Sequence, residues 1–261
     1  MKDPSEIAAG QRLHAGQEQH EPRFAVIAPM LNEADAVDGL VREIGEACAP
    51  LGAFEAILVN DGSTDATAER IAALRVEFPW LREIRHAAPC GQSAAIRSGV
   101  LAARADLICT IDGDGQNPPA EIPRMIQPLL DGDNPRLGLV AGQRLKRQDK
   151  ATRKLASRLA NSLRARVLRD DTRDTGCGLK AFPRDVFLSL PFFDHLHRYL
   201  PALVRREGLE VRLIDVDHRP RTGGATKYTN FGRAMVGVLD LIGVWWLLRR
   251  RRLPEIVHRD D

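Results

Sequence analysis

The chain has 261 residues, with 38 Lys and Arg against 35 Asp and Glu, and a formal net charge of +3. Its composition of 44% hydrophobic and 28% charged residues excludes a wholly disordered chain. No uncharged stretch reaches the roughly 20 residues that cross a bilayer, and the polar first residues do not match a secretory signal. The four cysteines form no CxxC pair, so we expect reduced thiols in a cytoplasmic protein.

Short apolar runs alternate with amphipathic stretches from residue 24 onward, after a polar tail predicted over 1–22. Strands are predicted at 24–29, 56–61, 83–87, 106–112 and 137–142. Helices are predicted at 34–48, from a Thr64 or Asp65 cap to about Val76, at 92–104 and from Pro118–Pro119 to about Leu130. This alternation predicts an α/β fold with a mostly parallel twisted sheet and helices on both faces.

Polar side chains follow three of the predicted strands, at the edge where parallel sheets bind ligands. The most informative run is DGDGQ at 112–116, because two carboxylates so close together repel each other unless a cation neutralises them. Oxygen ligands from Asp112, Asp114 and Gln116 suit Mg²⁺ or Mn²⁺ completed by substrate phosphates. A turn with surface acids is the alternative interpretation. Asp61 is expected on the same edge, where it can accept a hydrogen bond from a base or a ribose.

A basic segment at 150–169 is predicted to form a helix, because apolar residues recur there every four positions. Another face of this helix would place Arg153, Ser157, Asn161 and Arg164 in line. Guanidinium groups suit phosphate oxygens, so the segment indicates a phosphate ligand; a solvated basic face is the alternative.

The segment from Ala234 to Leu248 is apolar, but as a helix it would span only about 22 Å, less than the hydrocarbon core. Trp245 and Trp246 stand beside the arginines at 249–252, a combination typical of the membrane interface. We therefore expect residues 231–261 to form a C-terminal amphipathic interfacial helix and a basic tail, after a single domain at 23–230. The alternative is a helix that docks on the core.

Six motifs occur in an order that resembles the inverting family-2 glycosyltransferases with a GT-A fold: PMLNEAD (29–35), VNDGSTDAT (59–67), TIDGDGQNPP (110–119), DTGCGLKAFPRDVF (174–187), HRYLP (197–201) and RTGGATKY (221–228). More narrowly, the chain resembles the dolichyl/undecaprenyl-phosphate mannosyltransferase-like branch over roughly residues 23–250. The resemblance implies metal-dependent transfer of a sugar from a UDP- or GDP-linked donor to a polyprenyl phosphate at the cytosolic membrane face.

The resemblance also implies roles for individual residues. The metal, Mg²⁺ or Mn²⁺, would be held by Asp112, Asp114 and Gln116, and the nucleotide-sugar by Pro29, Glu33 and Asp61 together with the two acids. The acceptor phosphate would meet Arg144, Arg153, Ser157, Arg221 and Lys227. The groups expected to act in catalysis are Asp112, Asp114, Arg144 and Arg221. Gln92 stands where many relatives carry Lys, and Asp174 is expected to orient the sugar or an arginine.

The absence of a recognisable motif for a catalytic base favours a phosphate over a hydroxyl as the acceptor group. Relatives with hydroxyl acceptors often carry a Glu–Asp pair or a Gln-x-x-Arg-Trp box for the required base, and this sequence has neither. A lipid phosphate is mostly dianionic at neutral pH and needs no base. A hydroxyl acceptor on a glycolipid or cell-envelope saccharide is the alternative. A nucleic-acid-binding module is disfavoured because it leaves DGDGQ unexplained. The expected partners are an anionic membrane surface and a separate integral membrane protein.

Overall fold

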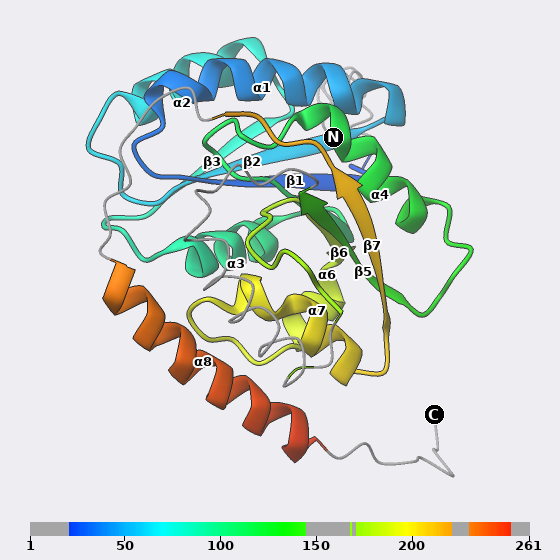
Figure 1. Ribbon diagram of the computed structural model, residues 1–261. Helices are drawn as coiled ribbons and strands as arrows, with labels where there is room; N and C mark the ends of the chain where they lie inside the picture. The colour runs from blue at the N-terminus through cyan, green and yellow to red at the C-terminus, as the bar shows by residue number, and fades with distance from the viewer. Residues whose placement is uncertain (1–20, 145–167, 169–170, 221–229, 252–261) are drawn as a thin grey trace, which may run out of the picture.

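The computed structural model describes residues 21–144, 168, 171–220 and 230–251 (Figure 1). The predicted alternation of strands and helices is confirmed between residues 24 and 144. The strands are β1 (Phe24–Met30), β2 (Phe54–Asn60), β3 (Leu81–Arg85), β4 (Leu107–Thr110), β5 (Leu137–Arg144), β6 (Lys180–Pro183) and β7 (Glu210–Val216). The helices are α1 (Ala34–Cys48), α2 (Thr67–Glu77), α3 (Gln92–Ala102), α4 (Ile122–Leu130), α6 (Arg184–Ser189), α7 (Leu196–Arg206) and α8 (Asn230–Arg250), with short 3₁₀ turns η1 (Ala49–Leu51) and η2 (Pro119–Glu121).

The strands form one mixed sheet in the order β3-β2-β1-β4-β6-β5-β7. Strands β1 to β4 pair in parallel, as predicted, whereas β6 runs antiparallel between β4 and β5. Strand β7 then pairs in parallel with β5 at the sheet edge. Neither β6 nor β7 was predicted, because β6 has only four residues and β7, EVRLIDV, interleaves charged residues with apolar ones.

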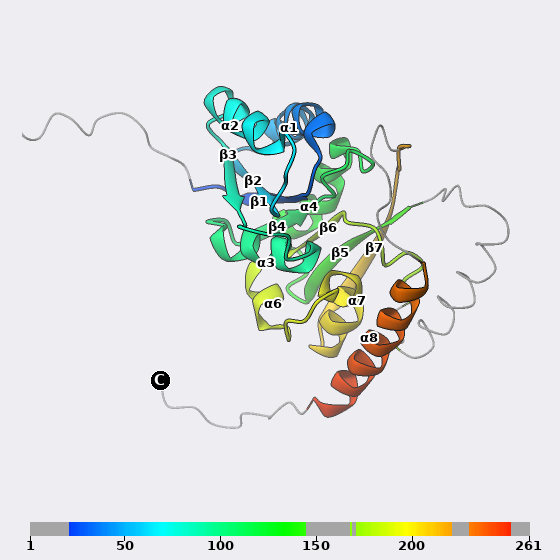
Figure 2. The same ribbon diagram turned by 90° about the vertical axis from the view of Figure 1, so that its left-hand side faces the viewer.

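Helices cover both faces of this sheet, as the continuous apolar runs predict (Figures 1 and 2). On β1, Val26, Ala28 and Met30 belong to the core under α1, α2 and α4, and Ala25 and Ile27 belong to the core under α3 and α7. Helix α3 lies so close to β1 that a Cβ on Gly99 would come within 2.5 Å of the Ile27 side chain. The expected twisted sheet with two covered faces is therefore confirmed.

Local sequence explains where the helices begin and which face they bury. The predicted face of α1 is buried, through Val37, Leu40, Val41 and Ile44. Helix α2 begins with Ala66 at its N-cap position, a small correction to the predicted caps. Asp65 still satisfies the first turn, because its carboxylate accepts a hydrogen bond from the Thr67 N–H at 3.0 Å.

The C-terminal helix α8 packs against α7 through one face only (Figure 2). Val244 is buried there, with Leu241 and Leu248 beside it, and Asp240 contacts the His195 ring at 2.8 Å. Other apolar side chains of α8 are exposed: Val238, Leu239, Ile242, Trp245 and Trp246. In the part of the chain that is described, no helix combines the length and apolar character needed to span a membrane.

Candidate active site

A cavity of about 400 Å³ opens where β1, β2 and β4 end, at the edge predicted to bind ligands. Its lining includes seven of the predicted site residues: Pro29, Glu33, Asp61, Asp112, Asp114, Gln116 and Arg144. Gly91 and Gln92, at the start of α3, close another side of it. The strand ends bring these positions together, although they are spread over the chain from residue 29 to residue 144.

The other predicted acceptor residues lie outside the described residues. These are Arg153, Ser157, Arg221 and Lys227, together with most of the predicted helix at 150–169. Leu168, near the end of this predicted helix, is helical and buried in the structure. The cavity therefore carries the predicted donor and metal residues, and Arg144 is its one described member of the predicted acceptor set.

Asp112 lines the cavity, and amide groups surround its carboxylate. Oδ1 accepts a hydrogen bond from the Gln92 side chain at 2.9 Å. Oδ2 accepts hydrogen bonds from the Asn117 side chain at 2.9 Å and from the Gly178 N–H at 3.2 Å. A Cβ on Gly178 would collide with this carboxylate, so only glycine allows the approach. Burial, and then the negative charge of Asp114, raise the pKa of Asp112 above its usual value.

Asp114 and Gln116 belong to the loop that follows Asp112. Asp114 accepts a hydrogen bond from the Gln116 N–H at 3.1 Å. The Gln116 carbonyl accepts one from the Arg219 N–H at 2.8 Å, which joins the loop to the segment after β7. Two carboxylates and an amide thus line one cavity, and a divalent cation would relieve the repulsion between the acids. The residues present therefore fit Mg²⁺ or Mn²⁺.

The oxygens of Asp112 are already engaged by three donors, whereas Asp114 has a single bond to the adjacent backbone among the described contacts. Asp114 is therefore the more accessible metal ligand of the pair. Asp112 is better placed to hold the loop and to face the ligand's polar groups.

Lys180 is a buried cation that the sequence reasoning missed, although it lies within the DTGCGLK motif. It stands on β6, 3% exposed, and its ammonium donates to the Cys177 carbonyl. Burial lowers the pKa of Lys180, while its positive charge lowers the pKa of Asp112. The antiparallel strand β6 thus places the positive charge of Lys180 near the Asp112 carboxylate, which follows β4.

Arg144, at the end of β5, forms an ion pair with Asp174. Its Nη2 donates to Oδ1 at 2.9 Å and its Nε donates to Oδ2, which makes a two-point contact. Hydrogen bonding to Asp174 raises the pKa of Arg144. Asp174 was expected to orient either the sugar or an arginine, and in the structure it orients the Arg144 side chain. The pair fixes the guanidinium at the cavity wall, where it can meet an anionic ligand.

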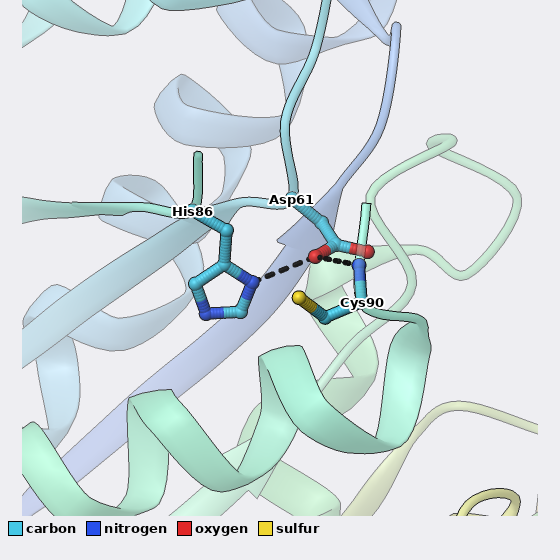
Figure 3. Close-up of side chains that lie close together, drawn as sticks. All are labelled: Asp61, His86 and Cys90. Carbon is cyan, nitrogen blue, oxygen red and sulfur yellow. Dashed lines mark hydrogen bonds and ion pairs between the residues drawn. The ribbon is translucent and has the colours of Figure 1, made fainter. Parts of the chain in front are cut away.

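Asp61, after β2, is bound by donors from the segment between β3 and α3 (Figure 3). Its Oδ1 lies 2.7 Å from His86 Nδ1 and accepts the Cys90 N–H at 2.9 Å, and its Oδ2 accepts the Gly91 N–H at 2.8 Å. A carboxylate offers about four acceptor positions, so one remains for a ligand. No sequence pattern pointed to His86 or Cys90, because only the fold places them beside Asp61.

His197 is buried behind this edge and contacts the Ser93 hydroxyl through Nδ1 at 2.7 Å. Burial lowers the pKa of His197 well below its usual value, so the ring is neutral. This contact joins the start of α7 to the start of α3, next to Gln92. It supports the cavity without lining it.

Comparison with known proteins identifies similar sequences over most of the chain. Residues 25–190 match the family model described as Glycosyl transferase family 2. A dodecaprenyl-phosphate galacturonate synthase of Rhizobium johnstonii is 33% identical over 236 residues, which cover 88% of this chain and 69% of that protein. An undecaprenyl-phosphate 4-deoxy-4-formamido-L-arabinose transferase of Salmonella newport is 33% identical over 222 residues, which cover 84% of this chain and 66% of that protein. The chain thus spans about two thirds of the length of these relatives.

Solved structures share the fold. Glucosyl-3-phosphoglycerate synthase from Mycobacterium tuberculosis, in complex with Mn²⁺, UDP-glucose and phosphoglyceric acid, superposes with a TM-score of 0.64 at 21% identity, covering 86% of this chain and 80% of that one. The crystal structure of a second mycobacterial protein gives a TM-score of 0.58 at 23% identity, covering 77% of this chain and 68% of that one. At these identities the likeness concerns the fold alone.

Proposed function

The chain belongs to glycosyl transferase family 2, and from this membership we propose that it moves a sugar from a nucleotide-sugar to a polyprenyl phosphate, with inversion at the anomeric carbon. The observation that carries the proposal is the cavity in which Asp61, the two acids of DGDGQ and Arg144 meet. Relatives named for polyprenyl-phosphate sugar transfer, each 33% identical, support the acceptor.

The nucleoside of the donor is assigned to the Asp61 end of the cavity. The carboxylate there is fixed by two backbone N–H groups and His86, and the fourth acceptor position suits the imino N–H of uracil or guanine. Pro29 and Glu33 line the same cavity. Either a UDP- or a GDP-linked sugar satisfies this chemistry.

The diphosphate of the donor is assigned to the DGDGQ end. There Asp114, with Gln116 and Asp112, would hold Mg²⁺ or Mn²⁺, which supplies positive charge to the diphosphate leaving group. The amides of Gln92 and Asn117 keep Asp112 oriented while the ligand changes.

The acceptor phosphate is assigned to Arg144, whose guanidinium is oriented by Asp174. A phosphate monoester with a second pKa of about 6 is already a nucleophile at neutral pH, so the site needs only to position it and to exclude water. Attack from the side opposite the leaving nucleoside diphosphate inverts the anomeric carbon. Arg153, Ser157, Arg221 and Lys227 are proposed to complete the phosphate site, and Arg153→Ala should weaken acceptor binding more than donor binding.

A membrane-surface location on the cytosolic leaflet is proposed from helix α8. Its exposed face carries Trp245 and Trp246, and Arg249 and Arg250 lie over these rings at 4.0 and 5.6 Å. Aromatic rings at headgroup depth with arginines beside them suit anionic lipid. A separate integral membrane protein is a further partner for this face.

The transfer reaction is tested with the purified chain, Mg²⁺, a labelled UDP- or GDP-sugar and undecaprenyl phosphate. The expected product is a lipid that releases its sugar in mild acid, as a glycosyl phosphate does. Undecaprenol, which lacks the phosphate, is the matched acceptor and should remain unlabelled. An acid-stable product, or labelling of a glycolipid hydroxyl in preference to the lipid phosphate, would replace the proposal with the hydroxyl-acceptor alternative.

Membrane association is tested by flotation with phosphatidylglycerol vesicles at low salt. The protein is expected to float, and the double variant Trp245→Ser, Trp246→Ser is expected to stay at the bottom. Val76→Ser is the matched control, since Val76 is a highly exposed apolar residue on α2, away from α8. If the wild-type protein does not float with these vesicles, α8 is not an interfacial helix.

A further inference from the structure

Three different ligand types meet beside the cavity, away from the DGDGQ loop: the Asp61 carboxylate, the His86 imidazole and the Cys90 thiol (Figure 3). One ligand atom from each lies within 4.8 Å of the other two. We propose that these residues form a second metal site, one that takes a thiophilic divalent transition metal of the zinc class and not Mg²⁺.

The donor set selects the metal. One nitrogen, one carboxylate oxygen and one thiolate sulfur are ligands that Zn²⁺ accepts, whereas Mg²⁺ prefers oxygen alone. In a tetrahedral zinc site, adjacent ligand atoms are about 3.2 to 3.6 Å apart, from the usual metal–ligand distances. His86 Nδ1 and Asp61 Oδ1, at 2.7 Å, are closer than this, so a small opening admits the ion.

Cys90 is the ligand that must move most, and its surroundings permit this. The residue is exposed, and its thiol has a weak hydrogen bond to the Ala88 carbonyl at 3.3 Å. Rotation of this short side chain brings the sulfur toward the other two ligands. The other three cysteines, Cys48, Cys109 and Cys177, are buried.

The outer contacts of the cluster already match those of a metal site. Backbone N–H groups of Cys90 and Gly91 hold the Asp61 carboxylate at 2.9 and 2.8 Å. His86 Nε2 lies 2.9 Å from the Ser98 hydroxyl, and a hydroxyl can donate or accept. When Nδ1 binds metal, the ring proton moves to Nε2 and is donated to Ser98, the second contact that metal-bound histidines require.

The proton and charge balance is simple. The Cys90 thiol releases one proton to solvent, and the imidazole keeps its single proton at the other nitrogen. Thiolate and carboxylate then neutralise the two positive charges of the ion. A fourth coordination position is left for water.

The site has a consequence that rests on the proposed function. Asp61 lines the cavity at the end assigned to the nucleoside. An ion bound at Oδ1 offsets the negative charge of this carboxylate and weakens the acceptor position left for the base on Oδ2, so the metal and the donor nucleotide should oppose each other's binding. Zinc-class metals would then inhibit the enzyme at a place distinct from its Mg²⁺ or Mn²⁺ site.

Co²⁺ is the probe, added to the full chain after treatment with a chelator. We expect one equivalent to give a thiolate-to-cobalt charge-transfer band in the near ultraviolet, which Zn²⁺ abolishes by displacement. Cys90→Ser should abolish the band and weaken Zn²⁺ binding in equilibrium dialysis more than about tenfold. His195→Gln is the matched control, because His195 also contacts carboxylates, Asp194 and Asp240, without a thiol. Its band should equal that of the wild type.

A wild-type protein without the band, or a Cys90→Ser protein that retains it, overturns the site. Ser98→Ala should weaken Zn²⁺ binding about 10-fold to 100-fold while the band remains, since it removes the second contact of His86. The opposition between metal and nucleotide is measured separately, as the thermal shift produced by UDP or GDP with and without Zn²⁺. A nucleotide shift that Zn²⁺ leaves unchanged, with the cobalt band present, supports the metal site and overturns the assignment of Asp61 to the nucleoside.

Discussion

Two successive parts of the chain, called here its first and second halves, build the cavity in different ways. In the first half, β1 to β5, each polar group follows its own strand, as Asp61 follows β2 and Asp112 follows β4. In the second half, residues 171–216, the groups stand behind or beside the cavity: Asp174 holds Arg144, Gly178 and Lys180 face Asp112, and His197 holds Ser93.

From this difference we propose that the first half carries the chemistry and the second half supports it. Substitutions in the first half should therefore change activity and metal binding with little effect on stability. Substitutions in the second half should lower the free energy of unfolding, because they leave buried polar groups without partners.

The largest effect is expected for Asp114→Ala. Loss of the accessible metal ligand should remove about 3 to 4 kcal/mol of transition-state stabilisation, or roughly 100-fold to 1,000-fold in kcat, with the fold intact. Sugar transfer and urea unfolding are measured together. Asp133→Ala, an exposed acid on the loop before β5, is the control and should match the wild type in both. A large loss of stability in Asp114→Ala would show that the first half also holds the fold together and would contradict this division.

Asp174→Ala should lower the free energy of unfolding by about 3 kcal/mol, because it leaves the half-buried Arg144 guanidinium without its carboxylate. Urea denaturation measures the change. Asp215→Ala is the control from the same half, since it breaks an exposed pair with Arg173 and should cost less than about 1 kcal/mol. If both variants lower the free energy of unfolding equally, the Asp174–Arg144 pair contributes no more to stability than an exposed ion pair.

The pH dependence of stability tests His197. Its folded pKa is depressed by burial, so below the usual value of 6.5 the unfolded chain binds a proton that the native state does not. The free energy of unfolding should fall as pH is lowered from about 6.5, by up to about 1.4 kcal/mol per pH unit from this group. Urea unfolding between about pH 5 and 7 should lose this part of the slope in His197→Gln but keep it in His195→Gln. An unchanged slope in His197→Gln would contradict the assignment.

The smallest effect is expected for Gln92→Lys, which places an ammonium group beside Asp112 at the metal end of the cavity. Repulsion should weaken Mn²⁺ binding about fivefold, roughly 1 kcal/mol, with stability unchanged. Mn²⁺ titration is the measurement. Gln127→Lys adds the same charge at an exposed position on α4 and is the control. Tighter Mn²⁺ binding in Gln92→Lys would mean that the amide of Gln92 opposes the metal.

The N-terminal elements were predictable because their signals are local. Apolar runs, periodic faces such as that of α1, and turn residues after each strand depend only on neighbouring residues. Parallel pairing then follows from the alternation of strands and helices, so the meeting of Asp61 with Asp112 and Asp114 at one edge could be inferred before any coordinates.

The sequence by itself determined the family, the strand ends that carry acids and the glycines that let the DGDGQ loop turn. Only the tertiary structure decided that β6 inserts antiparallel between β4 and β5, since its register with Thr110 and Val140 comes from long-range pairing. That insertion buries Lys180 behind Asp112. The contacts of Gln92 with Asp112 and of His86 and Cys90 with Asp61 likewise join segments 20 to 30 residues apart. Side-chain partners at such separations depend on how helices pack on the sheet, which no local pattern encodes.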